Sequence, residues 1–132
     1  MNNSIINKIL SMKTIAVVGM SPNAERPSHF VSKYMLHNGY KVFPVNPGQK
    51  EILGIKCYAV LKDIPHKIDI VNVFRNSDYV IPIINEAISI KAKAIWLQDG
   101  IVSGAGAAIA KNKNILFVMN DCMLRQHKRL ND

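Results

Sequence analysis

The stretch Thr14-Ile-Ala-Val-Val-Gly-Met-Ser21 decides the fold class of this chain. Four of its first five residues are β-branched, which is typical of a strand buried on both faces of a parallel sheet. Gly19 ends this strand, and residues 28–37 then carry an apolar stripe at helical spacing, closed by Asn38-Gly39. A strand, a short loop and an amphipathic helix predict the first part of a β-α-β unit.

The rest of the chain repeats this alternation. Residues 51–64 are the exception, because Gly54 and Pro65 interrupt them and predict short irregular pieces. We therefore expect one α/β domain over residues 1–132: a doubly wound, mainly parallel sheet of about five strands (Rossmann-like), with helices on both faces and right-handed crossovers. The further strands are predicted at 41–45, 68–73, 94–97 and 115–119, and the further helices at 2–11, 79–90, 103–112 and 122–130.

Length and cysteine content restrict the class of protein. A chain of 132 residues suits a single domain with one core. Its longest apolar runs, such as 115–119, are far shorter than the ~20 residues of a membrane helix, and the N-terminus lacks the pattern of a secretion signal. Cys57 and Cys122 are widely separated, which favours free thiols in a reducing compartment over a disulfide scaffold. We expect a cytoplasmic protein without a membrane partner.

The net charge of +8 has several interpretations. It suits an anionic small ligand, a lysine-rich proteome or a nucleic-acid surface. The dense basic cluster, residues 125–129, is typical of a solvated helix face, although a nucleotide-sensing regulator or nucleic-acid binder using Arg125, Lys128 and Arg129 remains an alternative. A nucleic-acid partner is not expected, because the chain shows neither a helix-turn-helix nor interleaved basic and aromatic residues.

The segments that follow the strands carry most of the unusual polar residues. In a doubly wound sheet, ligands bind beyond the carboxyl ends of the strands, near the point where strand order reverses. All of these segments should therefore lie at one edge of the sheet. They are Gly19–Ser28, Asn46-Pro47, Phe74-Arg75-Asn76, Gln98-Asp99-Gly100 and Asn120-Asp121-Cys122.

The first of these segments predicts an anion site. Gly19 and Ser21 precede a helix that should begin near Ser28, and a helix N-terminus attracts anions. Arg26 is placed to bind a phosphate through two hydrogen bonds. The pattern Gly-x-Gly-x-x-Gly is absent, so this is not the dinucleotide fingerprint. An ordinary strand–helix connection with a capping serine is the alternative.

The end of the second strand indicates which nucleotide the site would accept. Enzymes that use NAD usually carry Asp or Glu there, whereas this chain has Val45-Asn46-Pro47. The missing carboxylate favours a ribose that bears its own phosphate, as in coenzyme A or NADP. Asn46 is equally typical of a turn residue before Pro47.

Catalytic and metal sites are not predicted. His29, His37 and His66 lie in separate elements without ligand spacing, and no triad or carboxylate pair is visible. Cys122 and His127 are five residues apart, which is not a helical i, i+4 pair. A structural thiol is one interpretation of Cys122, and Trp96 is expected in the core. The alternative is a nucleotide- or acyl-CoA-dependent enzyme that uses Cys122 at a helix N-terminus.

Residues 14–21, Arg26-Pro27-Ser28 and residues 40–47 together resemble the stand-alone CoA-binding domain family. That family is related to the CoA-binding domain of the succinyl-CoA synthetase alpha subunit. The resemblance continues through 73–75, 94–100, Asn120-x-Cys122 and His127, and it covers roughly residues 8–130. At 120–122 and 126–127 this chain has Asn-Asp-Cys and Gln-His, where similar proteins tend to have Asp-Arg-Cys and Glu-His.

The resemblance implies coenzyme A (or an acyl-CoA) as the ligand of a small binding protein. It implies no catalytic residue in this short chain. The diphosphate and adenosine of the ligand would lie at the carboxyl edge of the sheet. By this resemblance Gly19, Ser21, Arg26 and Ser28 contact the diphosphate, Asn46 and Pro47 border the adenosine, Phe74 and Arg75 flank the ligand, and Gln98 and Gly100 line the opposite side.

Overall fold

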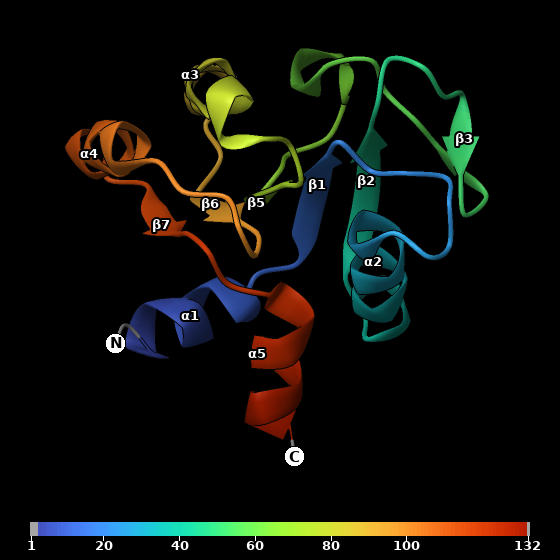
Figure 1. Cartoon of the computed structure of the whole chain (residues 1–132), viewed down its shortest axis with the longest axis horizontal. Helices are drawn as coiled ribbons and strands as arrows, with labels where there is room; N and C mark the ends of the chain where they lie inside the picture. Colours follow the sequence, from blue (N-terminus) through green and yellow to red (C-terminus); the bar gives the residue numbers. More distant parts are fainter. Residues whose placement is uncertain (1–2, 132) are drawn as a thin grey trace.

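A computed structural model describes residues 3–131 of the chain (Figure 1). Its main sheet has five parallel strands in the order β2-β1-β5-β6-β7, which confirms the predicted fold class. These strands are β1 (Thr14–Val18), β2 (Lys41–Val45), β5 (Ile70–Val73), β6 (Ala94–Leu97) and β7 (Leu116–Val118).

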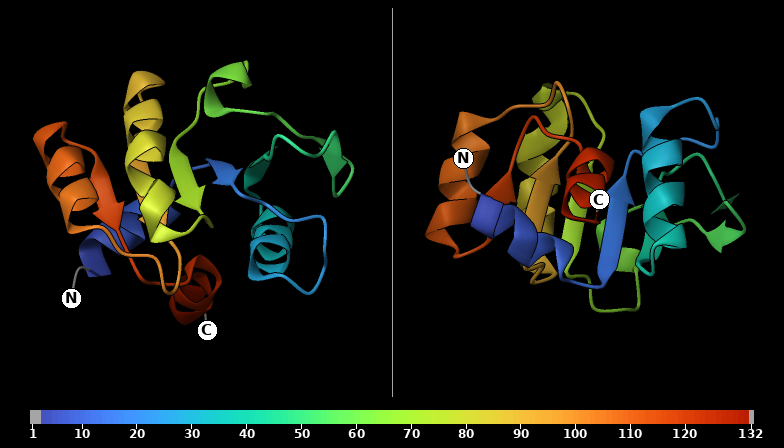
Figure 2. Two further views of the ribbon diagram at one scale, coloured as in Figure 1. Left: turned by 45° about the horizontal axis from the view of Figure 1, so that its top comes forward. Right: turned by 90° about the horizontal axis from the view of Figure 1, so that it is seen from below.

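Helices cover both faces of this sheet, as the alternating pattern predicts (Figures 1 and 2). One face packs against Ile9, Met35 and Met123, which belong to three different helices, and the other packs against Ile84 and Ile109. The helices of the first face are α1 (Asn3–Leu10), α2 (Pro27–His37) and α5 (Met123–Asn131), and those of the second are α3 (Val80–Ser89) and α4 (Gly104–Asn112).

The strands are apolar because helices cover both faces of the sheet, so the side chains on both faces are buried. Successive residues of a strand point to opposite faces, so Ile15 lies in one core and Ala16 in the other, at 1% and 0% exposure. Full burial of a large aliphatic side chain contributes about 1.5–3 kcal/mol. Trp96 is fully buried, as predicted, and its indole N–H donates to the Asp121 carbonyl at 2.9 Å. The buried indole therefore has a hydrogen-bond partner.

The element ends differ from the predicted ones where side chains take over backbone hydrogen bonds. The third strand of the main sheet begins at Ile70 instead of 68, because the Asp69 carboxylate accepts the N–H groups of Lys13 and Thr14. Residue 2 of the predicted first helix lies outside the described residues. Residues 51–64 form short pieces, as expected: an antiparallel pair, β3 (Glu51–Ile52) and β4 (Ile55–Lys56), and a 3-10 turn at Leu61–Asp63.

Strand order reverses between β1 and β5. The chain leaves β1 toward β2 on one side, and all later strands of the main sheet lie on the other side. The connections that follow β1 and β5 therefore diverge, which opens a crevice at their carboxyl ends. Among residues 3–131, no helix has the length and apolar content that crossing a membrane requires.

Candidate functional site

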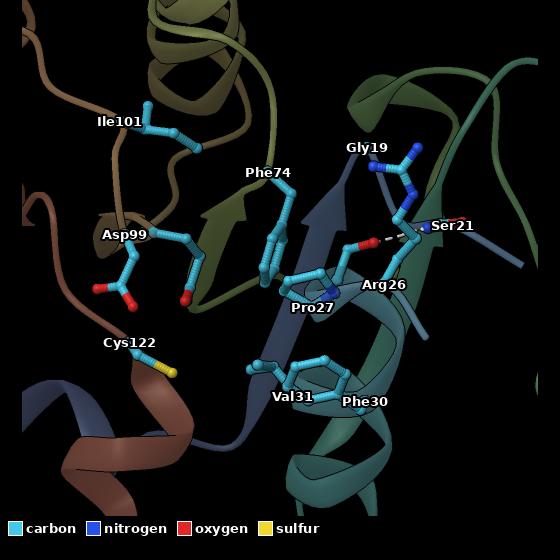
Figure 3. Close-up of a pocket in the computed structure, with 12 residues that line it drawn as sticks. Gly19, Ser21, Arg26, Pro27, Phe30, Val31, Phe74, Asp99, Ile101 and Cys122 are labelled. Carbon is cyan, nitrogen blue, oxygen red and sulfur yellow. Dashed lines mark hydrogen bonds between the residues drawn. The ribbon is translucent and has the colours of Figure 1, made fainter. Parts of the chain in front are cut away.

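A pocket of about 520 Å³ lies at this crevice (Figure 3). Figure 3 shows Arg26, Pro27 and Phe30 on one side, Asp99 and Cys122 on the other, and Phe74 between them. The volume is within the range of about 300–1,000 Å³ that is usual for small-molecule sites. The pocket is lined by Gly19, Ser21, Arg26, Pro27, Ser28, Phe30, Val31, Phe74, Gln98, Asp99, Ile101 and Cys122.

The loop after β1 is held against the first turn of α2. The Ser21 N–H donates to Ser28 Oγ at 2.9 Å, and His29 Nδ1 lies 3.0 Å from the Ser21 carbonyl oxygen. The helix begins at Pro27, and its N-cap is Arg26, whose side chain makes no capping hydrogen bond. Ser28 is therefore not the capping serine of the alternative interpretation. Its hydroxyl fixes the loop, and the Arg26 side chain lines the pocket at the helix N-terminus.

Both the backbone conformation at position 19 and the limited space beside it favour glycine there. Its φ is +85°, which is in the left-handed region, and a Cβ there would lie 2.8 Å from Arg75 Cδ. The Arg75 stem thus packs on the loop, and its guanidinium carbon lies 4.8 Å from the centroid of the Tyr79 ring. Arg75 supports the loop and is not among the lining residues.

Three further residues predicted for the site also lie outside the pocket lining. The Asn46 amide donates to the Met20 carbonyl at 2.9 Å, and its oxygen accepts the Gly48 N–H at 2.9 Å. Asn46 is thus a turn residue that also ties the turn to the first loop, with Pro47 beside it. The N–H of Gly100 donates to Asn120 Oδ1 at 2.8 Å, which joins two loops at the same edge.

An ion-pair network holds Asp99, which lines the pocket on the side opposite α2. Arg125 donates to both Asp99 oxygens at 2.9 and 3.1 Å and to Asp121 at 3.0 Å. This hydrogen bonding holds the pKa of Asp99 below its usual value. A second arginine of the basic segment 125–129 also has a hydrogen-bond partner within the chain, because Arg129 Nε donates to Gln126 Oε1 at 2.7 Å.

The two cysteines have different surroundings. Cys122 is half-buried, directly precedes α5 and lines the pocket, with its Sγ turned toward the Val31 side (Figure 3). Cys57 is 7% exposed, and burial raises the pKa of its thiol. His127 Nδ1 lies 2.8 Å from the Tyr34 hydroxyl. Within residues 3–131, no group of three or more His, Cys, Asp or Glu side chains is arranged to hold a metal ion.

Several lining residues were not predicted for the site. Phe30 belongs to the apolar stripe of residues 28–37, which predicts burial, yet it is 45% exposed at the pocket. Asp99 lies in a segment that the sequence does place at this edge. Asn72 does not line the pocket, but it is hydrogen-bonded to the lining residue Gln98, and it is 1% exposed in a strand that is otherwise apolar. That single amide in an apolar strand is the signal that would have identified it.

Comparison with known proteins identifies the family of this chain. A family model described as "CoA binding domain" matches residues 13–128. The chain is 41% identical over 115 residues to the uncharacterized protein YneT of Bacillus subtilis, covering 87% of this chain and 85% of that protein. A solved structure of a hypothetical protein from Pyrococcus horikoshii superposes with a TM-score of 0.95 at 38% identity, covering 100% of this chain and 94% of the other.

Larger enzymes also contain a matching segment. The ADP-forming acetate–CoA ligase of Methanocaldococcus jannaschii is 26% identical over 134 residues, which cover 90% of this chain but only 18% of the ligase. This chain therefore matches a small part of the ligase and nearly the whole of the small relatives. The resemblance seen in the sequence is confirmed, and the chain belongs to the CoA-binding domain family.

Proposed function

We propose that the pocket binds coenzyme A or an acyl-CoA, with the diphosphate against the N-terminus of α2. The observation that carries this proposal is the position of Arg26, which lines the pocket as the N-cap residue of α2 at the point where strand order reverses. A helix N-terminus and a guanidinium both favour a phosphate group. The hydroxyl groups of Ser21 and Ser28 are also at this end of the pocket.

The chemistry of the remaining lining suits the rest of such a ligand. Phe30, Val31 and Ile101 are apolar and would contact an uncharged arm. The carboxylate of Asp99 is paired with Arg125, so it presents less negative charge to an anion than a free carboxylate would. Coenzyme A combines a phosphate-rich end with a largely uncharged arm, and the two kinds of lining match these parts.

The adenosine would lie toward the turn at Asn46 and Pro47. The hydrogen bond from the Asn46 amide to the Met20 carbonyl connects this turn to the loop after β1. Neither residue is acidic, and Lys50 follows shortly after, so a phosphate on the ribose would meet no carboxylate from this turn. We also propose a reducing, cytoplasmic location, because both Cys57 and Cys122 are free thiols.

One observation favours a second candidate function. The thiol of Cys122 lines the same pocket at the start of α5. A reaction of a bound acyl-CoA or nucleotide at this thiol is therefore the alternative to binding alone. A depressed thiol pKa, measured by the pH dependence of alkylation, would favour it.

Calorimetric titration of the apo protein with coenzyme A, acetyl-CoA, NADP, NAD and ATP tests the proposal. We expect the CoA compounds to bind most tightly, and NADP to bind more tightly than NAD. Thermal unfolding gives an independent measure, since a ligand at 100 times its Kd stabilises the folded state by about 2.7 kcal/mol. Equal or stronger binding of NAD would contradict the argument from the ribose phosphate. A lack of CoA binding would contradict the proposed function.

A further inference from the structure

Asn72 is an amide in the middle of a buried parallel strand. It is 1% exposed, and its neighbours Val71 and Val73 in β5 are both at 0%. A buried amide is tolerated only when its polar atoms have partners. The partner of Asn72 Oδ1 is Gln98 Nε2 at 2.7 Å, and Asn72 Nδ2 lies 3.9 Å from Met123 Sδ.

This arrangement fixes the orientation of both amides. A thioether sulfur is a weak acceptor and not a donor, so the NH₂ group of Asn72 belongs on the side of Met123. Its oxygen then faces Gln98 and requires a donor there, which only the Gln98 NH₂ group can supply. Flipping both amides would keep a hydrogen bond between them but would turn the Asn72 oxygen onto the Met123 sulfur.

The locked orientation leaves the Gln98 oxygen for the pocket. Gln98 is 4% exposed and lines the pocket just beyond the end of β6. Its Nε2 is taken by Asn72, and its Oε1 makes no hydrogen bond among residues 3–131. This oxygen is not among the buried atoms without a partner, so solvent in the pocket reaches it, and the N–H donor of a ligand could take the place of water there.

We propose that Gln98 Oε1 accepts a hydrogen bond from an amide N–H in the arm of coenzyme A, and that Asn72 is the positioning residue that holds it in this orientation. This inference rests on the proposed function and names the part of the ligand that the inner wall of the pocket recognises. The arm of coenzyme A carries two secondary amides, each with one N–H. The adenosine phosphates would lie at Arg26, and the arm would pass Gln98 toward Cys122.

The test compares two ligands that differ only in the arm. Wild type, Gln98→Met and Gln98→Glu are titrated calorimetrically with coenzyme A and with 3′-phospho-ADP, which is the part of coenzyme A without the arm. Gln98→Met keeps the length of the side chain and removes the acceptor. We expect it to weaken coenzyme A binding by about tenfold, as for a lost hydrogen bond, and to leave 3′-phospho-ADP binding unchanged.

Gln98→Glu keeps an oxygen at the same length, but an ionised carboxylate cannot donate to Asn72 Oδ1, so this variant removes the donor that orients the side chain. Its ratio of coenzyme A affinity to 3′-phospho-ADP affinity should therefore fall, as it does for Gln98→Met. Asn72→Leu removes the group that orients Gln98 while nearly conserving volume. It should lower this ratio in the same direction as Gln98→Met, whereas a purely structural role of Asn72 would lower both affinities together.

The outcomes separate the inference from the proposed function. If wild type binds no coenzyme A, both are overturned. If wild type binds coenzyme A and Gln98→Met changes the two affinities equally or not at all, only the inference is overturned. If Gln98→Met fails to fold, NMR of the wild-type protein saturated with coenzyme A tests the inference instead. A nuclear Overhauser effect between an arm amide proton and the Gln98 side chain is expected, and its absence would overturn the inference.

Discussion

Ser28 Oγ accepts the backbone N–H of Ser21 at 2.9 Å and so fastens the loop after β1 to the first turn of α2. This bond joins the segment that would hold a phosphate to the helix whose N-terminus attracts it. The geometry of the proposed anion site therefore depends on Ser28, a residue that is only 5% exposed.

Ser28→Ala should lower both stability and ligand affinity. Removing the acceptor leaves the Ser21 N–H without its partner, which costs about 1 kcal/mol of unfolding free energy. Urea denaturation measures this loss. Ser32→Ala is the matched control in the same helix, because Ser32 Oγ is buried with no hydrogen-bond partner among the described residues. Its removal should be neutral or slightly stabilising, and an equal loss in both variants would contradict the role of Ser28.

Arg26→Ala should weaken coenzyme A binding by about 1.5–3 kcal/mol, the range for hydrogen bonds to charged groups. The melting temperature of the apo protein should hardly change, because the Arg26 side chain makes no capping hydrogen bond. Calorimetry gives the affinity, and Lys33→Ala controls for the loss of one positive charge on α2. An unchanged dissociation constant in Arg26→Ala would mean that the guanidinium does not bind the ligand.

A thiol reagent should modify Cys122 faster than Cys57, and saturating coenzyme A should slow the modification of Cys122. Cys122 lines the pocket, whereas Cys57 is buried with a raised thiol pKa. Only the thiolate reacts, so both accessibility and pKa disfavour Cys57. Mass spectrometry of the two peptides, with and without coenzyme A, measures the rates. If coenzyme A protects neither thiol, the ligand does not approach the start of α5.

The contribution of Asp69 to stability should depend on pH. Burial alone would raise the pKa of Asp69, but the N–H donors of Lys13 and Thr14 and the nearby Lys93 ammonium outweigh it, so the pKa is lowered. A depressed pKa stabilises the fold above the unfolded value of about 3.9, and this stabilisation is lost as the pH falls through the folded value. Asp69→Asn should therefore destabilise the protein at pH 7 by roughly 1.5–3 kcal/mol.

Denaturant unfolding of wild type and Asp69→Asn from pH 7 down to pH 3 tests this dependence. The difference between them should be constant at neutral pH and should shrink below about pH 4. Asp63→Asn replaces an exposed carboxylate and should show little effect. A difference between wild type and Asp69→Asn that does not change with pH would show that charge on Asp69 is not the cause.

The order of the elements followed from the sequence because it depends on local composition. Residues 15–18 are all apolar, and only a strand covered on both faces buries every side chain of such a run. The parallel sheet then brings the carboxyl ends of all strands to one edge. The sequence thus placed Gly19, Arg26 and Gln98 near one another without any knowledge of their contacts.

The ends of the helices and the contacts among the residues around the pocket could not be predicted from the sequence. Serine is a typical N-cap residue, so the sequence suggests Ser28 for that position. The backbone of Arg26 is extended, however, so Arg26 is the N-cap, and the Ser28 hydroxyl accepts the N–H of Ser21 instead. Arg125 has the appearance of a surface cation, yet it holds Asp99 from 26 residues away. Such pairs depend on which strands are neighbours and which rotamers fit between them, and neither is encoded in a local pattern.

By itself, the sequence determined the α/β class, the burial of the strands and the edge at which a ligand would bind, because each follows from the periodicity of apolar residues and from the parallel direction of the strands. Only the tertiary structure decided which residues of that edge line the pocket. Asn72 and Gln98 are 26 residues apart, and they meet because β5 and β6 are adjacent in register. A hydrogen bond is directional and acts over about 3 Å, so its partners become known only when the packing is known.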